Sequence, residues 1–250
     1  MTVWCATIAK WEEPYIREWI DWNKSIGIQH ILIADNNDDE RLMPVIQDYV
    51  DDGYVEVIDY RNKKSPQMEW LNHALKIAKE NEIEWLALVD VDEFIITDSL
   101  ARLLDGHTST ISLPWLIYDD NDQLYYEDRP VMERFTRTIS WARSGMTPCK
   151  SIWHVPTTDE IDSNHRPKKY KARLVPEDYN GSYVAHYMFK STEEYATKAR
   201  RGRVLRPNPP RYTKENYFRF NNCTKEKEQV FNDTIRYEKE QIIRRRVRNN

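Results

Sequence analysis

The first hundred residues alternate between short apolar runs and amphipathic segments. Apolar runs bounded by polar turns are typical of buried strands, and apolar residues three or four positions apart are typical of helices that cover them. The apolar runs are Val3–Ala9, Ile28–Ala34, Tyr54–Ile58 and Trp85–Val89. The helical spacing falls between them, at Tyr15–Ile26, Met43–Val50 and Met68–Ala78. This order predicts βαβ units, and therefore an α/β fold with an open, mostly parallel sheet flanked by helices.

Beyond residue 100 the pattern is less regular. The predicted strands are Thr110–Tyr118 and Ser182–Phe189, and Pro130–Thr138 is compatible with either a helix or a strand. The sequence Ser-Thr-Glu-Glu from Ser191 has the form of a capping box, so a helix is predicted from residue 192 to about residue 203. A mostly exposed helix is predicted over Glu226–Arg248, because helix formers dominate there without a clean apolar stripe.

Composition narrows the classes of function. No apolar run approaches the roughly 18 residues that a membrane span requires. Glycine accounts for only 6 of the 250 residues, and neither G-x-G-x-x-G nor G-x-x-x-x-G-K-[ST] occurs, so a bound nucleotide must be held by side chains and a metal. The three cysteines form no C-x-x-C pair, which argues against a disulfide framework and a structural zinc site. No basic region precedes a long apolar stretch at the N-terminus, so the cytoplasm is the expected location.

The most informative motif is Leu-Ala-Leu-Val-Asp-Val-Asp-Glu-Phe at residues 86–94, an apolar strand that ends in Asp90 and Asp92. In open α/β sheets, ligands bind beyond the carboxyl ends of the strands. Residues two apart in an extended segment point to the same side, so the two carboxylates can converge on one hard cation such as Mg²⁺ or Mn²⁺. The alternative is a solvated acidic turn.

Further blocks of sequence extend this motif into a family pattern. The blocks are Lys10–Glu13 with Tyr15–Trp19, His30–Asn37, Gln67–Ala74, Trp85–Phe94, Pro130–Phe135, His186–Tyr187, Ser191 and Lys198–Gly202. In this order the chain resembles glycosyltransferase family 92 and related family 2-like enzymes, which have the nucleotide-sugar GT-A fold. The resemblance spans about residues 1–205, and implies a GT-A-like catalytic domain there and a basic helical extension over 206–250. The chain departs from the pattern at Trp11, where relatives usually have Asn.

The resemblance implies an enzyme that transfers a hexose from a UDP-sugar to a glycan hydroxyl with inversion, and galactose is the first candidate for this hexose. Because UDP, a diphosphate, is the leaving group of the donor, a divalent cation, Mn²⁺ or Mg²⁺, is needed to neutralise the charge that develops on it. By resemblance, Asp92 is the first choice of ligand and Asp90 binds the metal through water or contacts the ribose. His186 is then the second protein ligand, although a lone histidine is also compatible with a structural role.

Other polar residues of these blocks are expected to contact the donor. They are Glu12, Glu13, Asp35, Gln67, Asn72, Lys198 and Arg201. The acids follow the first two strands, the amides open the helix before the metal-binding strand, and the cations lie on a later helix where they can contact phosphate. For each of them a helix cap or a solvated surface is the alternative.

An inverting transferase also needs a base within about 3 Å of the acceptor hydroxyl. By resemblance Glu133 is preferred, so Glu133 and Asp92 are the expected catalytic residues. The acids left as alternatives to Glu133 are Asp119, Asp120, Glu127 and Asp128. Six aromatic residues in this half of the chain are candidates for stacking on sugar rings or for the core: Trp115, Tyr118, Tyr125, Tyr126, Trp141 and Trp153.

Two rival functions remain open. An apolar strand that ends in Asp-x-Asp also begins haloacid-dehalogenase-like phosphatases, but these require a small residue and Thr where Glu93 and Phe94 stand. A non-catalytic carbohydrate-binding protein with the same fold is the second rival, and metal-dependent donor hydrolysis would separate it from an enzyme.

Charge is unevenly distributed, with a net +6 over residues 206–250 and −10 over the first 205. The acidic body argues against nucleic acid as the main partner. The run Arg244–Arg248 predicts a peripheral contact with an anionic membrane, at its inner face, where a lipid-linked glycan acceptor would sit. A frayed, solvated terminus is the alternative.

Overall fold

The computed structural model describes residues 1–139, 149–165, 167–168, 181–201 and 212–248, with residues 238–248 as backbone alone. The chain forms two compact units. Unit 1 comprises Met1–Ile117 and Ser140–His186, and unit 2 comprises Tyr118–Ile139 and Tyr187–Asn250. The division of domains at residue 205 stays a prediction.

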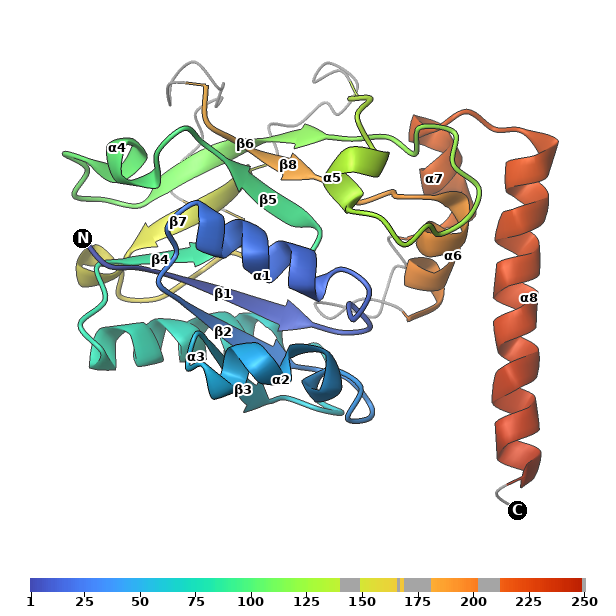
Figure 1. Cartoon of the computed structure of the whole chain (residues 1–250), viewed down its shortest axis with the longest axis horizontal. Coiled ribbons are helices and arrows are strands. Elements are labelled where there is room, and N and C mark those ends of the chain that lie inside the picture. The colour runs from blue at the N-terminus through green and yellow to red at the C-terminus, as the bar shows by residue number, and fades with distance from the viewer. Residues whose placement is uncertain (140–148, 166, 169–180, 202–211, 249–250) are drawn as a thin grey trace. The chain divides into compact units, whose positions relative to one another are not determined.

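Unit 1 is built on one sheet, in which the described strands follow the order β3-β2-β1-β4-β7-β6-β8-β5 (Figure 1). The strands are β1 (Val3–Ala9), β2 (His30–Asp35), β3 (Val55–Asp59), β4 (Trp85–Leu88), β5 (Glu93–Ile96), β6 (Ile111–Ile117), β7 (Cys149–His154) and β8 (Tyr183–His186). Strands β3, β2, β1 and β4 are parallel to one another, and β6 is parallel to β8. Strand β7 is antiparallel to β4 and β6, and β5 is antiparallel to β8. The predicted α/β sheet is confirmed.

Helices flank this sheet. They are α1 (Ile16–Ser25), α2 (Met43–Asp51), α3 (Gln67–Glu80) and α4 (Leu100–Leu104), followed by a short 3-10 helix at Val155–Thr157. Strand β1 lies between two parallel neighbours, and its apolar side chains are buried along nearly its whole length. Helix α3 packs against β1 and β4 through a buried stripe that includes Trp70 and Ala74. This burial explains why continuous apolar runs, rather than alternating ones, mark the parallel strands.

Helix α1 covers the edge strand β5 (Figure 1). The indole N–H of Trp19 donates to the Glu93 carbonyl at 3.0 Å, and that of Trp22 donates to the Ile95 carbonyl at 2.9 Å. Backbone carbonyls on the open side of an edge strand need partners. The two tryptophans, three residues apart on one helical face, supply them and fix β5 beside α1.

The sequence pattern did not predict β5, β7 or α4. Strand β5 begins with Glu93, and β7 contains Lys150, so a charged residue interrupts the apolar run in each. Both charges are buried and paired within unit 1. A hydrophobicity pattern cannot reveal such a strand, because its polar residues are neutralised by partners distant in sequence.

Unit 2 contains four described helices around a cluster of aromatic side chains. The helices are α5 (Val131–Arg134), α6 (Thr192–Arg201), α7 (Lys214–Phe220) and α8 (Lys225–Arg248). The capping box is confirmed: Glu194 N donates to Ser191 Oγ, and Ser191 N donates to Glu194 Oε2. The rings of Tyr195, Tyr217 and Phe231 pack together at centroid distances of 4.8 to 6.4 Å.

Helix α8 is less exposed than predicted at its start. Lys227, Val230 and Phe231 are buried, and α8 packs against α6. The side chains of Arg244–Arg248, on which the predicted membrane contact depends, lie outside the described residues. In the part of the chain that the structure describes, no helix is long and apolar enough to cross a bilayer.

Candidate metal and donor site

The acidic motif lies where β4 ends and the chain turns into β5. Glu93 N donates to the Asp90 carbonyl at 2.9 Å, which closes the turn. In the antiparallel pair of β5 and β8, Glu93 is directly opposite His186. Because side chains at opposed positions lie on the same face of a sheet, this register brings His186 to the acidic turn across a sequence gap of more than ninety residues.

Asp92, Glu93 and His186 form the described group that is able to hold a metal ion, with one ligand atom from each within 4.8 Å of the others. His186 Nε2 lies 3.7 Å from Asp92 Oδ1 and 3.9 Å from Glu93 Oε1. Ligand atoms about 2.1 Å from a shared ion lie roughly 3 to 4 Å apart, so the spacing suits one cation. Two carboxylates and an imidazole are ligands that Mn²⁺ accepts, and the carboxylates also suit Mg²⁺.

The two carboxylate oxygens of Glu93 have different surroundings. Its Oε2 accepts the Asp90 N–H at 2.9 Å and lies 3.3 Å from Lys150 Nζ. Its Oε1 is buried and accepts no hydrogen bond from the described residues. A buried oxygen without a donor is costly, so the geometry fits a cation at this position. Sequence reasoning did not propose Glu93 as a ligand.

Asp90 is held by Lys150, whose Nζ lies 2.9 Å from Asp90 Oδ2. Lys150 comes from β7 and its side chain is only 3% exposed. Burial by itself would raise the pKa of Asp90, but the ammonium group of Lys150 outweighs it and the pKa is lowered. The role of Asp90 toward a metal or a ribose stays a prediction. Lys150 was missed in the sequence, where a lysine among apolar strand residues is the only signal.

The pKa values of the other two groups follow from the same contacts. Burial raises the pKa of Glu93 well above its usual range, with Lys150 opposing the shift and Asp90 adding to it. For Lys150, burial favours the neutral amine, but Asp90 and Glu93 more than offset this effect and raise the pKa. The pair of Lys150 and Asp90 is therefore ionised at neutral pH.

The imidazole of His186 packs against an aromatic side chain. Its ring centroid lies 4.3 Å from that of Trp115, which is 4% exposed. Trp115 also contacts His165, with the two rings 5.1 Å apart. Trp115 was a candidate for sugar stacking, but it is a core residue that supports His186.

The acids predicted after β1 and β2 are at the carboxyl edge of the same sheet. Asp35 Oδ1 accepts two hydrogen bonds from Asn37, from the backbone N–H at 3.0 Å and from Nδ2 at 2.8 Å. Burial raises the pKa of Asp35 despite these bonds, and burial also raises the pKa of Glu13. Glu12 is buried at the start of the loop that leads into α1. Their contacts with a donor stay predictions.

Trp11, the position that departs from the family pattern, has an unusual backbone. Its φ is +55°, a region that L-residues rarely adopt. Its backbone N–H donates to Asn37 Oδ1 at 2.7 Å, and its indole N–H donates to Asp38 Oδ1 at 3.0 Å. The guanidinium of Arg41 lies 5.3 Å from the ring centroid. The loops after β1 and β2 are thus joined by side-chain contacts.

The two predicted amides lie on α3. Gln67 is buried at the first residue of the helix. Asn72 is engaged with another segment, because its Nδ2 donates to the Ile161 carbonyl at 3.0 Å and its Oδ1 accepts the Ile161 N–H at 2.9 Å. Asn72 therefore anchors the segment that follows β7, and a role for either amide in donor binding stays a prediction.

The remaining predicted residues belong to unit 2. Glu133 is exposed on α5. Lys198 is largely buried on α6, where its ammonium group lies 4.9 Å from the ring centroid of Tyr212. Arg201 is half-buried at the last residue of α6. The structure brings Asp92 and His186 together with Glu93 in unit 1, and it places the predicted base and phosphate ligands in unit 2.

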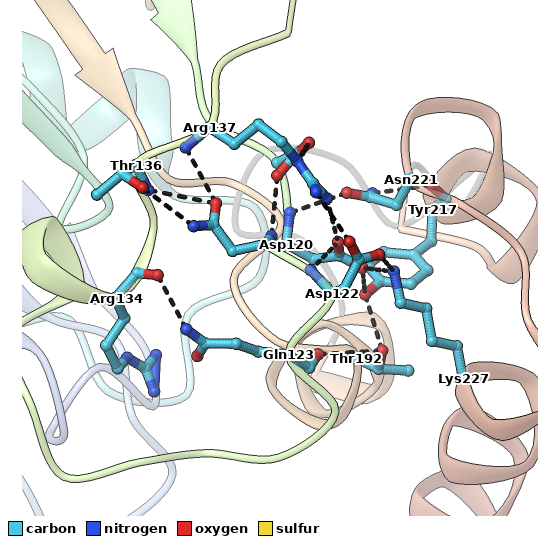
Figure 2. A network of polar contacts seen from close by, with 12 residues as sticks. Asp120, Asp122, Gln123, Arg134, Thr136, Arg137, Thr192, Tyr217, Asn221 and Lys227 are labelled. Carbon is cyan, nitrogen blue, oxygen red and sulfur yellow. Dashed lines mark hydrogen bonds and ion pairs between the residues drawn. The ribbon is translucent and has the colours of Figure 1, made fainter.

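A second acidic cluster lies in unit 2 (Figure 2). Asp120 is fully buried and accepts a hydrogen bond from the Tyr217 hydroxyl at 2.5 Å. Lys227 Nζ lies 2.7 Å from Asp120 and 2.8 Å from Asp122, and Arg137 lies 2.8 Å from Asp122. Hydrogen bonds from Arg137 and Lys227 lower the pKa of Asp122 to about 2. The cluster is neutralised by cations of this chain, so it joins elements of unit 2.

Comparison with known proteins decides the family. The model of glycosyltransferase family 92 matches residues 2–243, nearly the whole chain. The chain belongs to this family.

A rice relative, glycosyltransferase family 92 protein Os08g0121900 of Oryza sativa subsp. japonica, is 32% identical over 197 residues. These residues are 76% of this chain but only 30% of the rice protein. Family membership sets aside the phosphatase alternative.

Solved structures of low sequence identity also resemble the chain. The crystal structure of S. aureus TarS residues 1–349 is 16% identical, with a TM-score of 0.42, and the match covers 80% of this chain and 64% of that one. GalNAc-T7, solved with UDP, GalNAc and Mn²⁺, is 13% identical with a TM-score of 0.42, over 78% of this chain and 47% of that one.

Proposed function

We propose that this member of family 92 is a metal-dependent glycosyltransferase. It would move a hexose from a UDP-sugar to a glycan hydroxyl with inversion, and galactose is the preferred candidate for the hexose. The observation that carries the proposal is the buried group of Asp92, Glu93 and His186 at the carboxyl end of β4. Within a family of glycosyltransferases, a cation at this edge of the sheet would supply positive charge to the leaving diphosphate.

The proposed roles follow from the contacts of each residue. Asp92, Glu93 and His186 would hold Mn²⁺ or Mg²⁺, which supplies positive charge to the leaving diphosphate. Lys150 compensates the charge of Asp90 and pairs with one oxygen of Glu93, which would leave the other oxygen to hold the ion. Burial of the three side chains excludes water and strengthens their interaction with a charged ligand.

The other roles are assigned from the family pattern. Asp35 and the acids of the loop after β1 are proposed to face the nucleoside, because they lie at the carboxyl edge of parallel strands, where ligands of open sheets bind. Glu133 is proposed as the base that accepts the proton of the acceptor hydroxyl. Its exposed side chain is accessible to a glycan.

The experiment is a screen of UDP-sugars for hydrolysis and for thermal stabilisation, with Mn²⁺ and with EDTA. We expect hydrolysis in Mn²⁺ that is lost on chelation and lost in Asp92→Asn, while Asp98→Asn, an exposed aspartate of the same unit, stays active. A donor that binds only the native state stabilises the protein. This stabilisation should be largest in Mn²⁺, because the proposed ion would contribute to donor binding. Full turnover in EDTA would overturn the metal requirement. If the protein neither hydrolyses nor transfers from any UDP-sugar, a non-catalytic carbohydrate-binding protein is favoured instead.

A further inference from the structure

The structure shows which of the aromatic candidates for sugar stacking are exposed. Trp115 and Trp153 are buried in unit 1, and Trp141 lies outside the described residues. Tyr118 stacks on Tyr187, with the ring centroids 4.6 Å apart. The two that remain are consecutive and exposed: Tyr125 is 59% exposed and Tyr126 is 39% exposed.

Tyr125 makes no ring contact or hydrogen bond with the residues that the structure describes, whereas the backbone around it is held at nearly every position. The first N–H groups of α6 bind this segment, since Thr192 N donates to the Gln123 carbonyl at 3.1 Å and Glu193 N donates to the Leu124 carbonyl at 3.0 Å. Tyr126 N donates in turn to Glu193 Oε2 at 2.9 Å. Helix-terminal donors that would otherwise need water are used to fix the Gln123–Arg129 segment, the Tyr125 loop.

A buried ion pair also supports the loop. Arg134 binds Glu194 through two hydrogen bonds of 2.7 and 2.8 Å, and its side chain is fully buried. The same guanidinium donates to the Glu127 carbonyl at 3.0 Å and lies 5.3 Å from the Tyr126 ring centroid. The Arg134 carbonyl accepts from Gln123 Nε2 at 2.9 Å (Figure 2). The backbone of the loop is therefore anchored at several positions, whereas the Tyr125 side chain is exposed.

We propose that the Tyr125 loop is a glycan subsite, in which Tyr125 stacks on a sugar ring of the acceptor. The proposal rests on the proposed function, which supplies the class of ligand. A pyranose presents an apolar C–H face that matches an exposed aromatic ring, and tyrosine has few rotamers to lose on binding. A loop that is fixed before binding also avoids the entropic cost of ordering it.

The polar neighbours of Tyr125 suit the same ligand. Glu127 and Asp128 are exposed, and their carboxylates accept hydrogen bonds from hydroxyl groups. Arg129, paired with Glu127 at 3.0 Å, adds donors that suit the hydroxyl and ring oxygens of a sugar. An apolar ring with acceptors and donors beside it fits a neutral glycan better than a purely apolar or a strongly charged partner.

The test measures binding to a glycan array that carries oligosaccharides ending in galactose, glucose, mannose or N-acetylglucosamine, followed by titration of the best-bound soluble oligosaccharide. Tyr125→Ala should weaken this binding roughly tenfold, equivalent to about 1.4 kcal/mol, and Tyr125→Trp should retain it. Tyr237→Ala is the matched control, because Tyr237 is 63% exposed on α8.

Donor hydrolysis without acceptor separates this proposal from the proposed function. Tyr125→Ala should hydrolyse the UDP-sugar at the wild-type rate and should show a raised KM for acceptor in the transfer reaction. If the wild type hydrolyses no donor, the proposed function fails, but the array still tests the subsite. Wild-type protein that binds no glycan, or Tyr125→Ala that binds as well as wild type, overturns the subsite.

Discussion

Lys150 is almost fully buried between two carboxylates, although lysine is among the residues least often buried without a partner. Removing one member of a buried ion pair leaves an uncompensated charge in a poorly solvated place. The contacts of Lys150 therefore hold together the acidic turn as well as balancing its charge.

We expect Lys150→Met to lower the free energy of unfolding by about 3–5 kcal/mol, because Asp90 and Glu93 lose their shared cation. Urea denaturation measures this change. Lys76→Met is the control, since Lys76 is 72% exposed and should shift stability by less than about 0.5 kcal/mol. Equal stability of Lys150→Met and wild type would show that the cluster does not depend on this ion pair.

At the scale of single residues, the sequence predicted those candidate ligands whose position follows from local pattern. Asp90 and Asp92 stand out because acids directly follow a buried apolar strand. Glu93 was not predicted as a ligand, because its role depends on the register that sets it opposite His186. Lys150 was missed for the same reason, since its partners lie about sixty residues away in the chain.

The helices of unit 2 depend on polar contacts as well as on aromatic packing. Lys227 in the first turn of α8 reaches Asp120 and Asp122, and the Tyr217 hydroxyl of α7 reaches Asp120 (Figure 2). Asp120 N also donates to Asn221 Oδ1 at 3.0 Å. One short loop thus anchors two helices that follow it by about a hundred residues.

We expect Lys227→Met to destabilise unit 2 and to increase amide hydrogen exchange in residues 119–123 and in α7. The reason is the same as for any buried pair: two aspartates, one of them fully buried, would lose a cation, at a cost of about 3–5 kcal/mol. Hydrogen exchange followed by mass spectrometry locates the effect. Lys225→Met, an exposed lysine of the same helix, is the control, and unchanged protection in Lys227→Met would mean that aromatic packing alone holds these helices.

At the scale of elements, prediction succeeded where burial is symmetric. Strand β1 was predicted with the bounds that the structure shows, and β2 and β4 within about two residues, because these central strands are buried along nearly their whole length. The edge strand β3 was predicted within one residue, although Val55 is its one fully buried residue. Strands β5 and β7 contain buried charges and were missed. Helix α7 was missed because the prolines and polar residues before it obscure its start, where Thr213 accepts the Asn216 N–H.

For the whole molecule, the ordered blocks of sequence pointed to the family more strongly than any one motif, and the match over residues 2–243 confirms that assignment. Most of the blocks lie at a strand end, a strand pair or a helix start, and the last of them, Lys198–Gly202, includes the end of α6. The donor, the acceptor and the ion depend on the shapes of small surfaces, which no periodic pattern encodes.

We propose that His186, with Asp92 and Glu93, holds a cation that binds the diphosphate of the donor. The most direct measurement is the Kd of UDP by titration calorimetry for wild type and His186→Ala, each in Mn²⁺ and in EDTA, with His107→Ala, an exposed histidine of unit 1, as the control. We expect His186→Ala to weaken UDP binding roughly tenfold or more in Mn²⁺ and to leave the weak binding in EDTA unchanged, because a metal ligand acts only through the metal. Equal losses in both conditions, or no loss in Mn²⁺, would contradict it.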